Sequence, residues 1–264
     1  MTLAPGCLDL ATTEPPRGIV AWLRAPLVTL TFLTVLPIGK RITVGQDELP
    51  RAIGFFPLIG LLLGATCAGI AWLLSSRTSP ALVAIVASAW MALATGALHW
   101  DGLGDLADAL AGARGDRERA LAILRDPRMG SAGTVALVLG LLMQVAAIAR
   151  LSESGQWMAL VLAPVVSRAF VVPAVVLLPR ARPDGRAQAF ATSQASKTVA
   201  LLLAGLLSVP LLTHWFPGAV PLCAAFTAML AVVWVAQRTL GGMTGDVYGA
   251  AIVLSEVAFL ATFV

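Results

Sequence analysis

The sequence predicts an all-α, polytopic integral membrane protein, and three observations lead to this fold class. Of the 264 residues, 58% are apolar and only 12% are charged, whereas soluble domains are about 45 to 50% apolar and about 25% charged. The mean hydropathy is +0.87. The apolar residues form long continuous runs rather than the alternating pattern of a membrane barrel. A soluble globular enzyme is therefore excluded, and the length leaves room for about six to eight membrane helices in a bundle.

Eight apolar runs define the order of the expected helices, since a helix needs roughly 20 mostly apolar residues to cross a bilayer. The first run is short and contains two prolines, so it spans, re-enters or lies in the interface. The last run barely reaches across. The runs cover residues 25–38, 53–74, 80–98, 134–151, 156–178, 198–216, 219–236 and 249–264.

The chain divides into a tail and one domain. Residues 1–18 mix Pro, Thr, Gly and two acids and have no basic segment leading into an apolar stretch, so we expect a disordered N-terminal tail rather than a signal peptide. Residues 19–264 are expected to form a single transmembrane catalytic domain. The three cysteines include no CxxC pair and two lie in apolar runs, which excludes a disulfide framework and a zinc site.

The distribution of basic residues predicts the orientation in the membrane. Thirteen of the 18 follow the first, third, fifth and seventh apolar runs, and four lie on the opposite side. Positive charge stays on the cytoplasmic side, so the loops at 99–133, 179–197 and 237–248 are expected to face the cytoplasm from a bacterial inner membrane. The same rule explains the pI near 9.5 without a nucleic-acid partner.

An acidic segment carries the clearest chemical signal. Six of the 14 acidic residues lie between positions 101 and 126, and Asp101, Asp105 and Asp108 are spaced i, i+4 and i+7. On a helix this spacing places three carboxylates within about 60° of one another, and residues 102–113 include no Lys or Arg. A cation would relieve their repulsion, and hard oxygen ligands favour Mg²⁺ or Mn²⁺. A solvated acidic helix start is the alternative, but it explains Asp101 and not Asp108.

The segment RDPRMGSAG follows and predicts phosphate binding. Arg125 and Arg128 flank Asp126, and guanidinium groups bind phosphate through two hydrogen bonds. Asp126 either completes a metal shell or holds an arginine in place. Gly102 and Gly130 leave room for a ligand close to the backbone. Cytoplasmic topology alone is the alternative explanation of the arginines.

Further polar candidates lie near the acidic segment and within the membrane. Asp246, in the cluster GGMTGDVYGA at 241–250, either contacts substrate or caps the last helix. His99 could act as a base for an attacking hydroxyl or be a structural donor. Arg168 and Glu256 lie at membrane depth, where ionisable groups are usually partnered or functional, so they either pair or line the substrate cavity.

Five segments extend from the second apolar run to the last. They are FFPLIGLLLG at 55–64, HWDGLGDLADAL at 99–110, RDPRMGSAG at 125–133, SRAF at 167–170 and GGMTGDVYGAAIVLSE at 241–256. Together they resemble cobalamin synthase, the adenosylcobinamide-GDP ribazoletransferase family. The most specific element is the D-G-x-x-D-x-x-D run followed by R-D-x-R-x-G.

The resemblance implies the last stage of corrinoid nucleotide loop assembly. In that reaction α-ribazole, or its 5'-phosphate, attacks the phosphorus next to the cobinamide moiety of adenosylcobinamide-GDP. GMP leaves and adenosylcobalamin, or its 5'-phosphate, forms, with Mg²⁺ required. The resemblance places the metal-ligand role on Asp101, Asp105, Asp108 and Asp126, and it also matches Arg125, Arg128 and Asp246.

Two other functions remain alternatives at this stage. A CDP-alcohol phosphotransferase uses related chemistry, but its signature has an Ala-Arg pair where this chain has Asp105 and Leu106. A transporter would also place ionisable groups in the membrane, but no repeat symmetry is apparent. Membrane lipid is the expected solvent of the bundle, and an oligomer is compatible with it.

Overall fold

The computed structural model describes residues 19–36, 49–182, 194–215 and 217–264. The predicted N-terminal tail, residues 1–18, lies outside them. Every regular secondary-structure element in the described part of the chain is a helix, which confirms the all-α prediction. They are α1 Ile19–Leu33, α2 Leu49–Ala52, the 3-10 helix η2 Ile53–Phe55, α3 Phe56–Ser75, α4 Pro80–Thr95, α5 Leu98–Ala113, α6 Arg117–Ile123, α7 Ser131–Ser154, α8 Trp157–Leu177, α9 Gln194–His214, α10 Ala219–Thr239 and α11 Gly245–Ala261.

Five helices in the described ranges are long and apolar enough to cross a membrane: η2 with α3, α7, α8, α9 and α10. The pair α4 and α5 passes the same test when taken together, but the two are bent by 88°. These counts reach the lower end of the expected range. The first apolar run was expected at 25–38, and this boundary is wrong: α1 covers Ile19–Leu33, has 15 residues and contains Pro26, so it is too short to cross alone.

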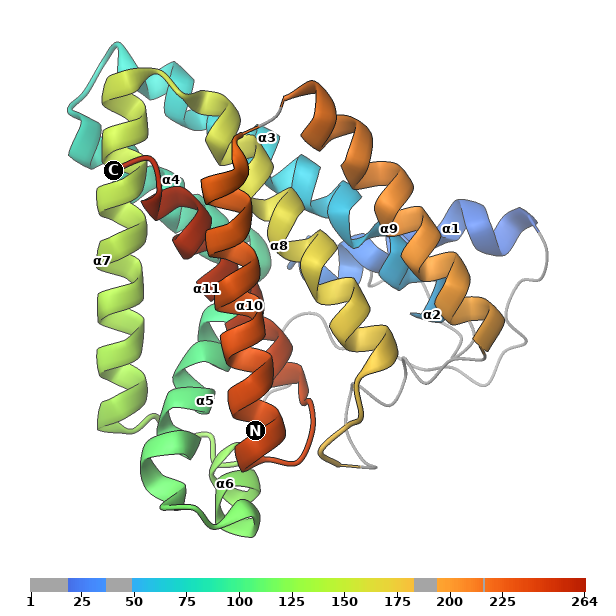
Figure 1. The fold of residues 1–264 in the computed structure, drawn as a ribbon. Coiled ribbons are helices and arrows are strands. Elements are labelled where there is room, and N and C mark those ends of the chain that lie inside the picture. Colours follow the sequence, from blue (N-terminus) through green and yellow to red (C-terminus); the bar gives the residue numbers. More distant parts are fainter. Residues whose placement is uncertain (1–18, 37–48, 183–193, 216) are drawn as a thin grey trace.

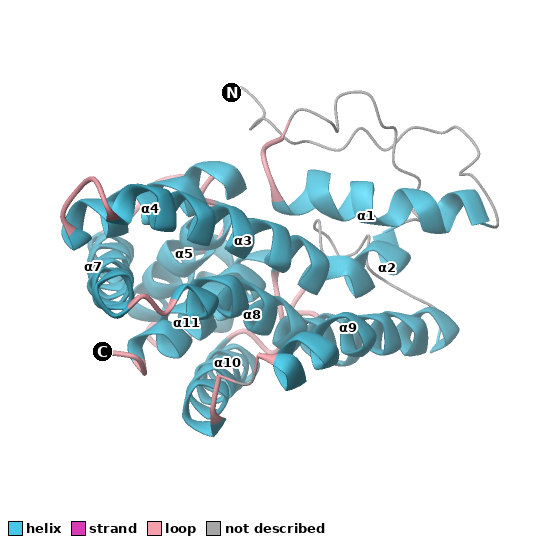
Figure 2. Ribbon diagram, turned by 90° about the horizontal axis from the view of Figure 1, so that it is seen from above, coloured by secondary structure: helices cyan, strands magenta, loops and turns pink. Residues whose placement is uncertain are grey.

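The centre of the bundle is occupied by α8 and α11, which the other helices surround (Figure 2). Helix α3 packs along α8 at Gly60 and Gly64, where an added Cβ would collide with the backbone of Pro164 and Val161 respectively. Small residues allow membrane helices to approach this closely. In consequence α8 is the most buried of the five spans, with 72% of its apolar window inside the protein.

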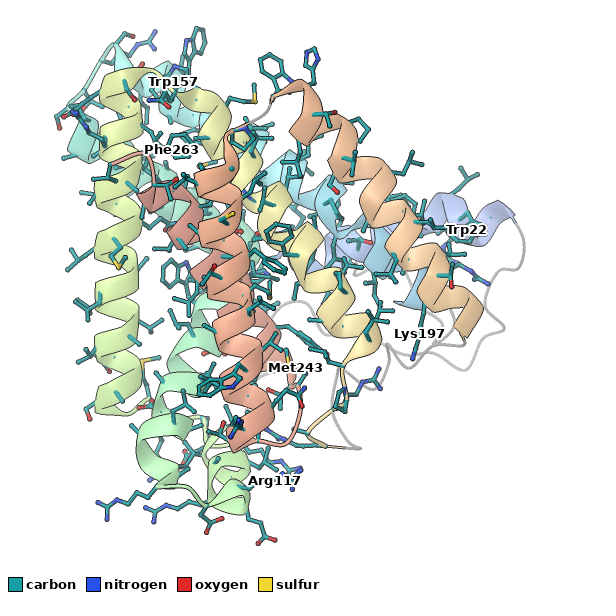
Figure 3. The ribbon with its side chains drawn as sticks, in the orientation of Figure 1. Trp22, Arg117, Trp157, Lys197, Met243 and Phe263 are labelled. Atoms are coloured by element: carbon teal, nitrogen blue, oxygen red, sulfur yellow. The ribbon has the colours of Figure 1, made fainter. Side chains whose placement is uncertain are left out.

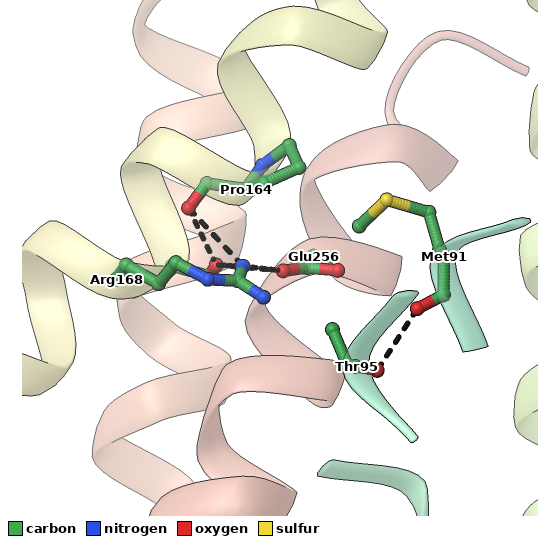
Figure 4. Close-up of polar contacts among 6 residues, drawn as sticks. Met91, Thr95, Pro164, Arg168 and Glu256 are labelled. Carbon is green, nitrogen blue, oxygen red and sulfur yellow. Dashed lines mark hydrogen bonds and ion pairs between the residues drawn. The ribbon is translucent and has the colours of Figure 1, made fainter. Parts of the chain in front are cut away.

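An ion pair joins the two central helices. Arg168 of α8 is 1% exposed and Glu256 of α11 is 6% exposed, and Arg168 Nη1 donates to Glu256 Oε1 (Figure 4). Ser167 Oγ donates to the same carboxylate oxygen at 3.0 Å. Pairing was one of the two roles expected for these residues, and the structure confirms it. Removing one partner of such a buried pair costs about 3 to 5 kcal/mol.

The three long loops predicted to share a face meet at one end of the bundle. Figure 3 places Arg117 and Met243 at the end that carries α6, and Trp157 and Phe263 at the opposite end. The short connections α3–α4 and α7–α8 lie at that opposite end, together with the C-terminus (Figure 1). The described parts of the three loops therefore lie on one side, as predicted. We call it the polar end.

Candidate active site

The acidic segment becomes a separate helix because the chain turns sharply before it. Gly96 and Ala97 both adopt the left-handed conformation, with φ of 60° and 56°. At this turn the chain bends by 88° between α4 and α5. Helix α5 begins at Leu98, so Asp101, Asp105 and Asp108 share one helical face as predicted. Because α5 carries these carboxylates and leads to the polar end, we treat it as lying outside the membrane-spanning segments.

Helix α11 brings a fourth carboxylate to α5. A Cβ on Gly102 would lie 2.5 Å from the carbonyl oxygen of Asp246, and one on Gly249 would lie 3.2 Å from the Cα of His99. The room that Gly102 leaves is therefore filled by α11. Asp246 does not cap this helix: Thr244 is the N-cap, and its Oγ1 accepts from Val247 N at 3.3 Å. Asp246 lies in the first helical turn instead.

The carboxylates influence one another electrostatically. Burial raises the pKa of Asp105 to about 7, and the charges of Asp101, Asp246 and Asp108 add to the shift. Burial also raises the pKa of Asp246, although the nearby Arg182 opposes this. Three side chains of α5 and one of α11 thus form a single acidic cluster, and like charges in it disfavour full ionisation. We call these four residues the acidic face.

Asp108 has a defined structural task within the acidic face. Its two carboxylate oxygens accept hydrogen bonds from Gly130 N at 2.6 Å and Gly133 N at 2.8 Å. These amides belong to the start of α7, whose N-cap Gly130 has no side chain of its own to offer. Asp108 therefore caps α7 from another helix, where a negative charge also favours the helix dipole. A Cβ at Gly130 or Gly133 would collide with this carboxylate.

Asp126 lies in the loop between α6 and α7, where Arg128 binds it. Arg128 Nη2 donates to Asp126 Oδ2 at 2.6 Å, and Arg128 Nε donates to Oδ1 at 2.9 Å. These bonds lower the pKa of Asp126 to about 2. Holding an arginine in place was one of its two expected roles, and the structure shows that arrangement. Arg125 and Arg128 are exposed at the polar end, where an anionic ligand can reach them.

His99 and Arg168 lie deeper in the protein than the acidic face. His99, in the first turn of α5, is 5% exposed. The guanidinium of Arg168 is engaged by Glu256.

Two arginines at the polar end were predicted only as basic loop residues. Arg117 donates to the carbonyl oxygens of Leu240 and Ala181, at 2.7 and 2.8 Å. Arg182 follows Ala181 and lies close enough to Asp246 to affect its ionisation. Their sequence neighbourhood offers no signal for either role, because every partner lies more than 60 residues away.

Comparison with known proteins identifies the family. The family model described as Cobalamin-5-phosphate synthase matches residues 25–264. The chain belongs to this family. An adenosylcobinamide-GDP ribazoletransferase from Geotalea daltonii is 38% identical over 92% of this chain and 97% of its own length. Proteins of the same name from Pseudomonas paraeruginosa and Pseudomonas savastanoi pv. phaseolicola are 38% and 40% identical, over 90% and 89% of this chain and 96% of each relative. No solved structure matches the chain.

The acidic face fits a divalent cation that is shared with a ligand. Within the described residues, no group of three His, Cys, Asp or Glu side chains converges closely enough to hold an ion on its own. Mg²⁺ in proteins is usually bound by one or two carboxylates, several waters and the phosphates of a substrate. Asp101 and Asp105 offer such a pair. Burial is the main cause of the raised pKa of Asp105, and the neighbouring carboxylates add to it.

Proposed function

We propose that this chain transfers the adenosylcobinamide-phosphate moiety of adenosylcobinamide-GDP to α-ribazole or α-ribazole 5'-phosphate. GMP is released, and adenosylcobalamin or its 5'-phosphate is formed. The observation that carries this proposal is the acidic face, where α5 and α11 bring four carboxylates together at the end that also holds Arg125, Arg128 and Arg182. Membership in the family supports the same reaction, as do the names of its relatives.

We propose Mg²⁺ as the cofactor, held by Asp101 and Asp105. When bound, the ion would neutralise phosphate oxygens and stabilise the charge that develops during transfer. Asp246 adds negative charge from α11, whose backbone contacts α5 at Gly102. Of the other two predicted ligands, Asp108 is engaged by amides of α7 and Asp126 by Arg128. Their contribution is to hold α7 and the arginine loop in position.

The exposed arginines of the polar end are proposed to bind the phosphates of the donor. Asp126 fixes the guanidinium of Arg128 by two of its nitrogens, and Arg125 is exposed in the same loop. Planar guanidinium groups suit a diphosphate because they donate two parallel hydrogen bonds. Gly130 belongs to this site indirectly, because it lets the loop approach Asp108.

The acceptor hydroxyl is proposed to attack phosphorus directly, without an enzyme-bound intermediate. Cys67 is buried in α3 and Cys223 lies on α10 within the apolar layer, so neither thiol is placed for nucleophilic attack at the polar end. The imidazole of His99 could accept the proton of the hydroxyl, although its burial favours a structural role. A direct displacement inverts the configuration at phosphorus.

The proposed location is the bacterial cytoplasmic membrane, with the polar end in the cytoplasm. The excess of basic residues on this side supports that orientation. Membrane lipid surrounds the spans, whose exposed side chains include Leu142, Leu206 and Trp234.

The experiment that tests this function uses the purified full-length chain in detergent. Adenosylcobinamide-GDP and α-ribazole should yield cobalamin and an equal amount of GMP when Mg²⁺ is present, and neither product when it is removed. CMP release from CDP-alcohol substrates would instead support the phospholipid alternative. A donor made chiral at the transferred phosphorus should give inverted product. GMP released without acceptor would contradict direct displacement.

A further inference from the structure

One guanidinium group at the polar end connects three segments that are far apart in the sequence. Arg117, the first residue of α6, donates through Nε to Leu240 O at 2.7 Å and through Nη2 to Ala181 O at 2.8 Å. Leu240 is the C-cap residue of α10, and Ala181 follows α8. A planar fork of donors binds two carbonyl oxygens at fixed spacing, whereas the ammonium of a lysine has three rotatable donors and no rigid fork.

The two segments that Arg117 joins are also bound directly to each other. Met243 N donates to Pro179 O at 2.9 Å, and Ala181 N donates to Met243 O at 3.0 Å. Together with Arg117 these bonds fix the five residues between α10 and α11. Figure 3 shows Arg117 and Met243 together at the polar end.

The fixed segment determines where α11 begins. Thr244 caps the helix directly after Met243, and Asp246 follows in the first turn with its carbonyl against Gly102 of α5. Arg117 itself is joined to α5 by a short turn, and α5 and α6 pack together. The hydrogen bonds of Arg117 therefore connect α6 to the segment before α11. Because α6 packs on α5 and α11 contacts α5 at Gly102, the three helices hold one another in position.

We propose that Arg117 is a positioning residue for the transfer reaction. By holding the start of α11, it places Asp246 against Asp101 and Asp105, so that the acidic face has the geometry to accept a divalent ion. The inference rests on the proposed function, because it assigns the acidic face to metal binding. Arg117 acts through Asp246 and does not need to touch the substrate.

The test measures Mn²⁺ binding by electron paramagnetic resonance in the full-length protein, alone and with adenosylcobinamide-GDP, together with kcat at saturating Mg²⁺. Arg117→Ala should weaken Mn²⁺ affinity about tenfold, the typical size of an effect from a residue that orients a ligand, and should lower kcat. The Mn²⁺ affinity and kcat of Arg117→Lys should lie between those of the wild type and Arg117→Ala, because one hydrogen bond can survive. Arg119→Ala, an exposed arginine on the same helix, should match the wild type.

A double-mutant cycle separates positioning from general stabilisation. In the background of Asp246→Asn, Arg117→Ala should cause no further loss of Mn²⁺ affinity, because its effect passes through Asp246. An equal loss in both backgrounds would overturn the inference, and so would wild-type affinity in a folded Arg117→Ala protein. If that variant does not fold, wild-type affinity and kcat in Arg117→Lys would overturn it.

Product formation and Mn²⁺ binding by the wild-type protein distinguish this inference from the proposed function. A wild-type protein that binds Mn²⁺ but forms no cobalamin and no GMP would contradict the function, while the Mn²⁺ series would still decide the role of Arg117. A wild-type protein that forms product but binds no Mn²⁺, either alone or with adenosylcobinamide-GDP, would overturn the inference and leave the function standing.

Discussion

Gly102 and Asp246 touch backbone to backbone, since a Cβ on Gly102 would lie 2.5 Å from the Asp246 carbonyl oxygen and 3.0 Å from its Cα. This contact joins α5, which carries three carboxylates of the acidic face, to α11, which carries the fourth. The separation of the two helices is thus set by the absence of a side chain at position 102.

Replacing Gly102 with alanine should force α5 and α11 apart. Such overpacking costs about 1 to 3 kcal/mol, and it should weaken Mn²⁺ binding because the four carboxylates no longer keep their spacing. Thermal unfolding in detergent and Mn²⁺ titration measure the two effects. Gly69→Ala is the matched control, since a methyl group there meets no atom within 4 Å. Equal behaviour of the two variants would show that the contact is not required.

Neutralising either proposed metal ligand should remove most of the activity. Asp101→Asn and Asp105→Asn preserve side-chain shape but remove charge that would hold Mg²⁺, and loss of a metal ligand should lower turnover by at least about a hundredfold. GMP release at several Mg²⁺ concentrations is the measurement. Full activity of Asp105→Asn at low Mg²⁺ would mean that the acidic face is only a solvated surface.

Asp108 should affect stability more than metal binding. Asp108→Ala removes the acceptor for both Gly130 N and Gly133 N, and loss of such a cap costs about 0.5 to 2 kcal/mol. Asp108→Asn retains one acceptor oxygen and should lose less. Melting temperatures of the two variants, compared with their Mn²⁺ affinities, test this assignment. A large loss of affinity with an unchanged melting temperature would return Asp108 to the ligand set.

The helical acidic face could be predicted from the sequence because it depends on local periodicity. The i, i+4, i+7 spacing of Asp101, Asp105 and Asp108 is visible in the residues themselves, and α5 has the expected register. Five of the eight apolar runs correspond to helices that can span a membrane, because length and hydropathy are local properties. The run at 80–98 qualifies only together with α5, and the first and last runs correspond to α1 and α11, which are shorter. Pairing was one of the two roles that the cost of isolated charge at membrane depth predicted for Arg168 and Glu256, and the structure shows the pair.

The remaining parts of the site depend on contacts between distant segments. Ala97 adopts a left-handed conformation without being glycine, so nothing in its residue type indicates the bend that creates α5. The bonds of Asp108 to Gly130 and of Arg117 to Leu240 join residues 22 and 123 positions apart. No spacing rule covers such distances, so the sequence could not predict that Asp108 caps α7 or that Arg117 binds two distant carbonyl oxygens.

The orientation of the bundle leads to a labelling prediction at the two ends of α7. Ser131 and Ser154 begin and end this helix and both are exposed. In a background without Cys7, Cys67 and Cys223, a cysteine at Ser154 should react with a membrane-impermeant maleimide added to the periplasmic side, and a cysteine at Ser131 should not. The two sites share one span, so each is the control for the other. Periplasmic labelling at Ser131 would reverse the assigned face.

The affinity of the acidic face for a divalent ion should depend on pH through Asp105. Its pKa in the folded protein is about 7, above the ordinary 3.8, so a proton competes with the ion below pH 7. Affinity for Mn²⁺ should fall about tenfold for each pH unit below 7 and level off above it.

The same shift affects the stability of the metal-free protein. Because the ionised form of Asp105 is favoured in the unfolded chain, stability should decline as pH rises from about 4 to about 7, and added Mg²⁺ should cancel that decline. Asp126, with a pKa of about 2, stays ionised over this range and contributes nothing to the change in stability.

The pH dependence of ion affinity is measured by Mn²⁺ titrations at several pH values, with Asp105→Asn as the control that should lose the pH dependence. If the wild type and Asp105→Asn gave the same pH profile, another group would be responsible.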